Sequence, residues 1–426
     1  MNHVWSKRFG NADDQVASRV AADTAGNVIV AGYFRGAVDF GGGDLTSAGS
    51  EDIFIAKFDP DGGYLWSKRF GAADNQYAFG LAVDLSGNVI VTGEFIGSVD
   101  FGGGDLTSAG VYDIFVAKFD PDGGYLWSKR FGDDGLQFSH AVDVDASGNP
   151  IAAGDFFGTV DFGGGVLSSA LTVDVFAAKF TAGGSYLWSK DFGDPDYQYA
   201  RGVAVDASGN VIITGPFAGS VNFGGDVLTS AGQYDVYVAK FDPDGMHLWS
   251  KRFGDLNSQV ANAVAVDAAG NVVVAGDFAG AMDFGGGALT SAGNTDIFIA
   301  KLDPNGAHLW SKRFGDSSNQ TPCDVAVDAS GNAILAGQFS GMVNFGGRTL
   351  TSAGGKDIFI ARFGPDGIHI QSARFGDGDD QGASGVAFDA AGNTIVTGQF
   401  SGVVNFGGGA LTSAGSKDVF LAKLAP

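Results

Sequence analysis

Short apolar runs separated by turn-forming residues fill this chain from end to end. In one representative stretch the runs cover residues 79–84, 89–95, 113–119 and 125–131. Each run is short, rich in β-branched or aromatic residues, and bounded by Gly, Pro, Asn or Asp, which is typical of β-strands. No segment keeps a helical period long enough to compete. The pattern therefore predicts four strands, which we name A to D in chain order.

The connections between these strands differ in length. The A–B turn covers 84–88 and the C–D turn covers 120–123, and both are tight turns of Asp, Gly, Asn or Pro. The B–C connection, 97–110, is long and glycine-rich. We predict a loop there.

The whole unit recurs every 61 residues. The phenylalanines that end strand D show the interval most clearly: Phe9, Phe70, Phe131, Phe192, Phe253, Phe314 and Phe375. Tryptophans follow the same spacing from Trp5 to Trp310, and Ile370 takes the seventh slot one residue out of step. A fixed period of this length indicates a repeat architecture.

Seven repeats of four antiparallel strands predict an all-β fold, a seven-bladed β-propeller, as a single domain over residues 1–426. The chain begins on a strand D, residues 3–9, and stops just after a strand C, residues 418–424. We expect strand 3–9 to complete the blade formed by about residues 384–424, because a long strand edge would otherwise stay unpaired.

The repeat resembles the bacterial seven-bladed β-propeller (SBBP) repeat. The matching motifs are Asp-Ile-Phe-Ile-Ala-Lys-Phe-Asp-Pro-Asp-Gly at 52–62, Trp-Ser-Lys-Arg-Phe-Gly at 66–71, Ala-Val-Asp-Leu-Ser-Gly-Asn at 82–88 and Val-Thr-Gly at 91–93. The resemblance covers all seven repeats and implies the fold. It also implies a bacterial, secreted or surface-associated protein, and it carries no functional residues. The longer B–C connection departs from the family pattern.

Composition and charge exclude several classes of partner. The net charge is −23, so nucleic acid and anionic membranes are poor partners. No apolar run reaches the length of a membrane span, and we expect no membrane insertion. The start of the chain is no signal peptide, and Cys323, the one cysteine, cannot form an intrachain disulfide.

Two acidic positions recur in every repeat. The Asp23 position stands three residues before a Gly-Asn pair. We interpret it as a turn residue whose carboxylate accepts backbone N–H groups of the turn. The alternative is that these carboxylates bind Ca²⁺ together with the Asp-Pro-Asp-Gly loops. The Asp52 position opens strand C, five residues before Lys57 or its equivalent, which is Arg362 in one repeat. We interpret this position as a polar tie between blades, and we predict no metal site.

A glutamine recurs without exception in an otherwise variable connection between strands D and A. Its seven copies are Gln15, Gln76, Gln137, Gln198, Gln259, Gln320 and Gln381. One interpretation is a buried amide that bridges neighbouring blades. The alternative is a ring of amides around the channel mouth that binds a polar ligand, because an amide both donates and accepts hydrogen bonds.

Variation between repeats concentrates on the face that carries the D–A and B–C connections. Its candidate ligand-binding residues are aromatic or basic and come from the second to the fourth repeat: Tyr77, Tyr112, Phe138, His140, Tyr199, Arg201 and Tyr234. The corresponding positions of the later repeats are small or polar. Rigid aromatics on loops are common anchors for partners. Packing between blades is the alternative.

These features predict a non-enzymatic module, with no cofactor, that binds a protein or a carbohydrate as a monomer. The histidines form no cluster with metal-ligand spacing, and Cys323 has no histidine near it in sequence. A purely structural repeat or surface-display element is the rival function, and an enzyme at the channel mouth is a further, weaker one. Lectin activity is the sharper form of the binding hypothesis.

Overall fold

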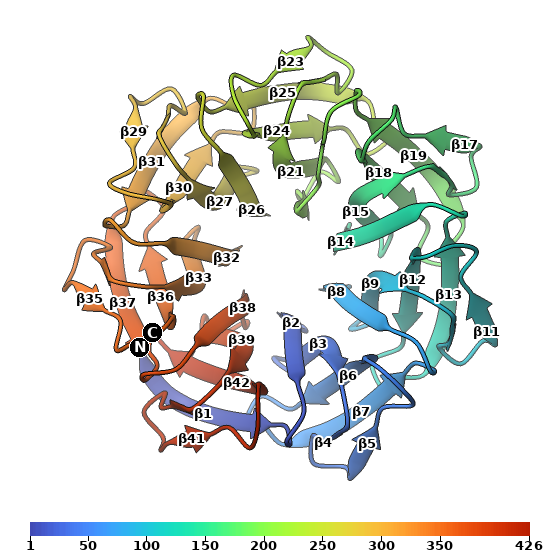
Figure 1. Ribbon diagram of the computed structural model, residues 1–426, viewed down its shortest axis with the longest axis vertical. Coiled ribbons are helices and arrows are strands. Elements are labelled where there is room, and N and C mark those ends of the chain that lie inside the picture. The colour runs from blue at the N-terminus through green and yellow to red at the C-terminus, as the bar shows by residue number, and fades with distance from the viewer.

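The computed structural model describes residues 1–426 and contains strands as its only regular elements. Seven four-stranded antiparallel sheets stand around a central channel, and the chain visits them in order around the ring (Figure 1). The predicted all-β, seven-bladed propeller is confirmed. No helix in the structure is long and apolar enough to cross a membrane.

Blade 2 shows the plan that all seven blades share. Its sheet order is β8-β9-β12-β13, with bounds β8 (Gln76–Val83), β9 (Val89–Phe95), β12 (Asp113–Phe119) and β13 (Tyr125–Phe131). The inner strand β8 lies beside the channel and β13 forms the outer edge (Figure 1). Strands B, C and D have the predicted bounds, and strand A begins three residues earlier than predicted.

The remaining blades repeat this order from the channel outward. Their strands are β2 (Gln15–Ala22), β3 (Val28–Phe34), β6 (Asp52–Phe58) and β7 (Tyr64–Phe70) in blade 1; β14 (Leu136–Val144), β15 (Pro150–Phe157), β18 (Asp174–Phe180) and β19 (Tyr186–Phe192) in blade 3; β20 (Gly202–Val205), β21 (Val211–Phe217), β24 (Asp235–Phe241) and β25 (His247–Phe253) in blade 4; β26 (Gln259–Val266), β27 (Val272–Phe278), β30 (Asp296–Leu302) and β31 (His308–Phe314) in blade 5; and β32 (Gln320–Val327), β33 (Ala333–Phe339), β36 (Asp357–Phe363) and β37 (His369–Phe375) in blade 6.

The ring closes as predicted. Blade 7 has the order β38-β39-β42-β1, with bounds β38 (Gln381–Phe388), β39 (Thr394–Phe400), β42 (Asp418–Ala425) and β1 (Asn2–Phe9). Strand β1 pairs antiparallel with β42, and the two chain ends lie together (Figure 1). Trp5 and Phe9 of β1 are buried in the core between blades 7 and 1.

The B–C connection is more ordered than the sequence predicts. In place of a loop it forms a small two-stranded hairpin at the outer rim of each blade: β4 (Ala37–Asp39) with β5 (Asp44–Thr46), β10 (Ser98–Asp100) with β11 (Asp105–Thr107), β16 (Thr159–Asp161) with β17 (Val166–Ser168), β22 (Ser220–Val221) with β23 (Leu228–Thr229), β28 (Ala281–Met282) with β29 (Leu289–Thr290), β34 (Met342–Val343) with β35 (Leu350–Thr351), and β40 (Val403–Val404) with β41 (Leu411–Thr412). Packing explains it, because Phe101 lies 4.8 Å from the ring of Phe115. Strands this short leave too little periodicity to recognise in sequence.

The apolar cores lie between adjacent blades. One core joins Ile29 and Ile53 of blade 1 to Val89, Phe95 and Phe115 of blade 2. Each blade therefore buries its apolar faces against its two neighbours, and the ring is held together by packing around its whole circumference.

Polar ties join successive blades on the face of the A–B and C–D turns. The indole N–H of Trp66 and the ammonium of Lys57 both donate to the carbonyl of Pro121 in the next blade, each over 3.0 Å. The seventh tryptophan slot is occupied by Gln371. Gln371 lies opposite Arg362 in the strand pairing, just as Trp66 lies opposite Lys57. The prediction of Ile370 for this slot was wrong. Gln371 instead accepts a hydrogen bond from the Met1 amino group.

The two acidic positions have different partners. Asp23 caps the A–B turn by accepting the N–H groups of Ala25 and Asn27, and it pairs with Lys57 over 2.9 Å. Asp52 pairs with Arg69 of its own blade, not with Lys57. The tie between blades therefore runs through Lys57 and the turn carbonyl, and the carboxylate of Asp23 is already occupied by donors of the protein.

Candidate functional site

A β-bulge in the inner strand builds the mouth of the channel. In blade 2 the pairing of β8 with β9 shifts register between Ala78 and Gly80, which leaves Phe79 as the extra residue. A bulge re-aims one side chain without disturbing the rest of the ladder. Five other blades carry the same shift, and in blade 4 strand β20 begins directly after the corresponding residue, Arg201.

The seven bulge positions all line one cavity. They carry different side chains around the ring: Ser18, Phe79, His140, Arg201, Asn262, Cys323 and Ser384. The cavity has a volume of about 490 Å³ and lies on the face of the D–A and B–C connections. The blades are otherwise nearly identical, so the seven-fold repetition is broken where the channel opens.

Three further variable positions surround the bulge residues. Strand B contributes Tyr33, Glu94, Asp155, Pro216, Asp277, Gln338 and Gln399. Strand A contributes Val16, Tyr77, Phe138, Tyr199, Val260, Thr321 and Gly382, and the residue before strand C is Glu51, Tyr112, Val173, Tyr234, Thr295, Lys356 or Lys417. Sequence reasoning missed the strand B set. Aligning the repeats at their period of 61 residues would have found it, as a variable column between an invariant Gly and an invariant Phe.

Six rings from blades 1 to 3 form a continuous aromatic cluster. Tyr77, Tyr112, Phe138 and His140, all predicted, join Phe79 and the unpredicted Tyr33, with neighbouring ring centroids between 4.8 and 6.4 Å apart. All six side chains are half-buried. They pack on one another and still present surface to the mouth.

The predicted residues of blade 4 continue this cluster. The Tyr199 and Tyr234 rings lie 6.2 Å apart, and the guanidinium of Arg201 lies 5.3 Å from the centroid of Tyr199. Burial raises the pKa of Tyr199 to about 12, so its hydroxyl stays protonated. Arg201 Nη1 lies 3.4 Å from His140 Nε2, which links blade 4 to the cluster. The structure thus brings all seven predicted aromatic and basic residues into one band.

The opposite side of the mouth is polar and small. The Asn262 side chain donates to Asp277 Oδ1 over 2.9 Å and to the Pro322 carbonyl over 3.0 Å. The hydroxyl of Ser384 donates to the carbonyl of Ala17. The mouth therefore has an aromatic half and a hydrogen-bonding half.

Two acids lie beneath the aromatic half. Asp155 Oδ1 lies 2.9 Å from His140 Nε2. Glu94 is 8% exposed and its Oε2 has no partner. Burial raises the pKa of Glu94 to about 8, and the nearby Asp155 charge adds to the shift. Glu94 is therefore mostly protonated at neutral pH.

The thiol at the mouth is not an activated nucleophile. Burial raises the pKa of Cys323 to about 12. The thiolate is the reactive form, and a pKa this high keeps its population very small near neutral pH. No group of three or more His, Cys, Asp or Glu side chains is arranged to hold a metal ion.

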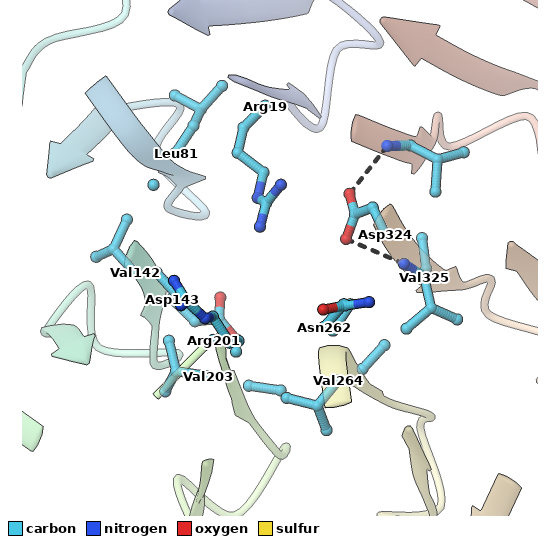
Figure 2. Close-up of a pocket in the computed structure, with 18 of the residues that line it drawn as sticks. Arg19, Leu81, Val142, Asp143, Arg201, Val203, Asn262, Val264, Asp324 and Val325 are labelled. Carbon is cyan, nitrogen blue, oxygen red and sulfur yellow. Dashed lines mark hydrogen bonds between the residues drawn. The ribbon is translucent and has the colours of Figure 1, made fainter. Parts of the chain in front are cut away.

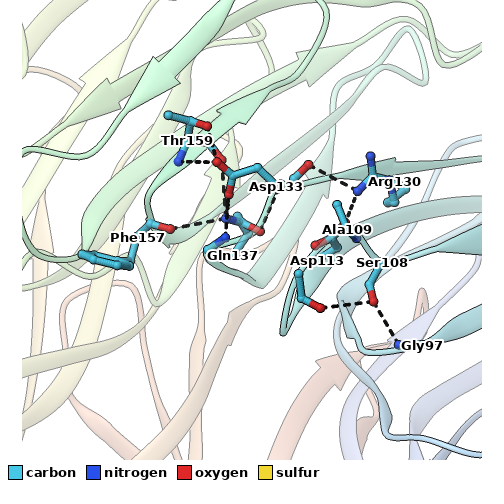
Figure 3. Close-up of polar contacts among 12 residues, drawn as sticks. Gly97, Ser108, Ala109, Asp113, Arg130, Asp133, Gln137, Phe157 and Thr159 are labelled. Atoms are coloured by element: carbon cyan, nitrogen blue, oxygen red, sulfur yellow. Dashed lines mark hydrogen bonds and ion pairs between the residues drawn. The ribbon is translucent and has the colours of Figure 1, made fainter.

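The seven glutamines lie away from the mouth. Gln137 is fully buried, accepts the backbone N–H of Asp133, and donates to the carbonyl of Phe157 over 3.3 Å (Figure 3). The other six are also fully buried and make the equivalent bonds. The ligand-binding ring proposed for Gln15, Gln76, Gln137, Gln198, Gln259, Gln320 and Gln381 was wrong. Each amide instead fastens the D–A connection, which enters from the preceding blade, to the end of strand B.

Below the mouth the channel narrows into an apolar passage of about 290 Å³, lined mainly by Val, Ala and Leu side chains. Four charged residues interrupt this lining: Arg19, Asp143, Arg201 and Asp324 (Figure 2). Asp143 accepts the N–H of Val205 and Asp324 accepts that of Val386, each on the next blade. Burial raises the pKa of Asp143 to about 6.

Fold and mouth together define a seven-bladed β-propeller with a variable opening to its channel. The chain is similar to the uncharacterized WD repeat-containing protein L264 of Acanthamoeba polyphaga mimivirus, with 23% identity over 80% of this chain and 31% of that protein. It is also similar to the regulatory protein FlaEY of Caulobacter vibrioides, with 27% identity over 37% of this chain and 17% of that protein. The chain spans less than a third of the length of either relative.

Two solved structures are also similar to this chain, at low identity. The WD40 propeller domain of Doa1 matches all of this chain and 96% of its own, with 10% identity and a TM-score of 0.48. Sqt1 from Chaetomium thermophilum matches all of this chain and 99% of its own, with 12% identity and a TM-score of 0.48. No protein-family model matches the chain.

Proposed function

We propose that this propeller is a non-enzymatic recognition module that binds a protein segment at the variable mouth of its channel. One observation carries the proposal: the bulge residue, which differs between almost all of the otherwise near-identical blades, lines a single cavity in all seven of them. Seven identical blades would satisfy the packing of the ring. Variation concentrated at the mouth therefore indicates a requirement other than folding.

The chemistry of the mouth suits a protein ligand. Half-buried aromatic side chains give contact area with few rotamers to immobilise, and such residues dominate binding energy at interfaces. The cavity of about 490 Å³ falls in the usual range for ligand pockets, roughly 300–1,000 Å³. The likeness to a WD repeat-containing protein also favours this class of function.

Glycan recognition is the second candidate. Aromatic rings on one side of the mouth and Asn262, Thr321 and Ser384 on the other would suit the apolar face and the hydroxyl groups of a sugar. The repeat's resemblance to the bacterial SBBP repeat supports a secreted or cell-surface location, and we propose a monomer. A structural or surface-display role is the rival, for which the mouth would need no ligand.

A selection experiment separates these functions. A random peptide library and a glycan array are probed with the native chain and with a mouth variant carrying Tyr77→Ser, Phe138→Ser and Tyr199→Ser. The matched control carries Leu65→Ser, Leu126→Ser and Leu187→Ser, three exposed apolar side chains on the outer strands. Protein recognition predicts enriched peptides that bind the native chain and the control but not the mouth variant.

The other possible outcomes each favour one of the rival functions. Specific glycans without peptides would favour the lectin function, and no enrichment in either format would favour the structural role. The Tm of every variant is measured alongside. A large fall in the Tm of the mouth variant, with binding retained by its folded fraction, would assign the three aromatic residues to packing between blades.

A further inference from the structure

Two arginines at the mouth have no carboxylate partner. Thirteen lysine and arginine side chains of this acidic chain form ion pairs with aspartates. Arg19 instead donates to the carbonyls of Ser18 and Ser384, over 3.2 and 2.9 Å. Arg201 lies against His140 and over Tyr199. Their positive charge is therefore not neutralised by direct ion pairs.

The two guanidiniums face a shared space. Arg19 comes from β2 of blade 1 and Arg201 precedes β20 of blade 4, three blades away around the ring. Both residues line the mouth cavity and also the narrower passage beneath it. Figure 2 shows Arg19 extending toward the middle of the channel and Arg201 on another side of it. They mark the level at which the wide opening becomes a channel.

None of the acids near these arginines forms an ion pair with them, and most are held by other groups of the protein. Asp324 and Asp143 each accept two backbone N–H groups. Asp155 contacts His140. Glu94 is buried and mostly protonated at neutral pH, as its raised pKa of about 8 indicates. A guanidinium left without a carboxylate in a partly desolvated site favours an incoming anion.

We propose that the mouth binds a single carboxylate group between Arg19 and Arg201, with the apolar part of the ligand against Tyr33 and Phe79; this rests on the proposed recognition function. One negative charge fits better than several, because exposed aspartates such as Asp13, Asp74 and Asp134 lie in the D–A connections of the same face and the net charge is −23. The carboxylate belongs either to a polypeptide, as its C-terminus or an acidic side chain, or to a small organic acid.

Cys323 provides a built-in reporter, because its thiol lines the same cavity. Its raised pKa keeps alkylation slow, but a ratio of two alkylation rates does not depend on the size of the thiolate population. The experiment compares its alkylation by iodoacetate, which carries a carboxylate, with alkylation by the neutral iodoacetamide. We compare the ratio of the two rates in the native chain and in the double variant Arg19→Gln, Arg201→Gln. The loss of charge-assisted hydrogen bonds predicts that this ratio falls about tenfold.

Matched variants separate a local effect from net charge and from misfolding. The control Arg35→Gln, Arg348→Gln removes the same charge from two exposed arginines, and its ratio should equal the native one. The variant Arg19→Lys, Arg201→Lys keeps the charge and should keep most of the preference. The Tm of each variant verifies that it is folded. A ratio that is the same in the native chain and in the glutamine double variant overturns the proposal.

Protection of Cys323 from iodoacetamide then identifies the source of the carboxylate. The probes are benzoate with benzamide, and the peptide Gly-Gly-Phe as its free acid and as its amide. The acids should protect and the amides should not. Stronger protection by the peptide acid assigns a polypeptide, and stronger protection by benzoate assigns a small acid.

Equal protection by acid and amide, or no protection by any probe, overturns the carboxylate site. That result leaves the recognition function testable by its own experiment. Peptides selected at the mouth without any dependence on a carboxylate would support recognition while rejecting this ligand chemistry.

Discussion

Asp174 differs from its six counterparts at the start of strand C. The other six pair with an arginine of strand D, and in blade 3 that arginine is replaced by Asp191. Asp174 Oδ2 keeps a hydrogen bond from the Ala170 N–H but has no arginine partner, and Oδ1 has no partner in any of the seven copies. Burial raises the pKa of Asp174 to about 6, and the negative charges of Asp191 and Asp194 add to the shift.

The substitution Asp191→Arg should stabilise the protein near neutral pH. In the native chain Asp174 titrates near pH 6 when folded and near 3.9 when unfolded. The folded state therefore binds more protons between these values, and the unfolding free energy falls as the pH rises from about 4 to 6. An arginine at 191 would lower the folded pKa and recover part of this loss. The paired copies Asp52, Asp235 and Asp296 still have raised pKa values because of burial, so the expected gain is about 1 kcal/mol at pH 7.

Urea unfolding of both proteins at several values between pH 4 and 7 measures this gain. The difference in unfolding free energy should be small at pH 4 and should grow toward pH 7. A difference that does not change with pH would mean that Asp174 is not the group responsible.

At the scale of the element, β1 is the strand whose position depends most on contacts between distant parts of the sequence. It has no covalent neighbour within its own sheet and reaches β42 from the other end of the sequence. Its seven paired positions cover the edge of β42, and Trp5 and Phe9 fill the core between blades 7 and 1. The stability of the last blade therefore depends on the first residues of the chain.

Deletion of residues 1–9 should destabilise the protein strongly. Removing Trp5 and Phe9 resembles two large-to-small core changes of about 3–5 kcal/mol each, comparable with the whole stability of many domains, about 5–15 kcal/mol. We expect a large fall in Tm or the loss of a cooperative transition. The control Val4→Ser, at an exposed position of the same strand, should have little effect. A truncated chain with the native Tm would contradict the closure of the ring through β1.

At the scale of the whole molecule, the chain ends lie where a C–D turn stands in every other blade. His3 pairs with Leu424 as Tyr64 pairs with Phe58. Five residues, 59–63, connect the latter pair, whereas Ala425, Pro426, Met1 and Asn2 lie between His3 and Leu424. These four residues at the chain ends form what we call the seam, which is thus one residue shorter than a C–D turn.

A circular permutant should therefore fold to the same ring. We replace Ala425, Pro426, Met1 and Asn2 by Asp-Pro-Asp-Gly-Gly and open the chain between Asp122 and Gly123, in the C–D turn of blade 2. Because both changes fall in equivalent exposed turns, the Tm should stay within about 5 °C of the native value. A second permutant, opened between Thr92 and Gly93 inside β9, is the control and should fail to fold. Failure of both proteins would reject the equivalence of the seam and the turns.

The sequence by itself determined the strands, their period and the closure of the ring. Strand bounds such as 113–119 and 125–131 follow from alternation and turn residues, which act over a few neighbouring positions. The spacing from Phe9 to Phe375 then sets the number of blades. The same comparison of repeats located the variable face and seven of the residues that gather there.

Only the tertiary structure decided what the variable residues form. The bulge at Phe79 changes which side chain faces the channel, and no alternation pattern indicates where it falls. The invariance of Gln76 suggested a ligand site, yet that amide is buried by contacts with segments about 20 residues away. Arg19 and Arg201 share a cavity because the ring brings distant blades to one axis. Local sequence encodes each blade, and closure of the ring creates the site.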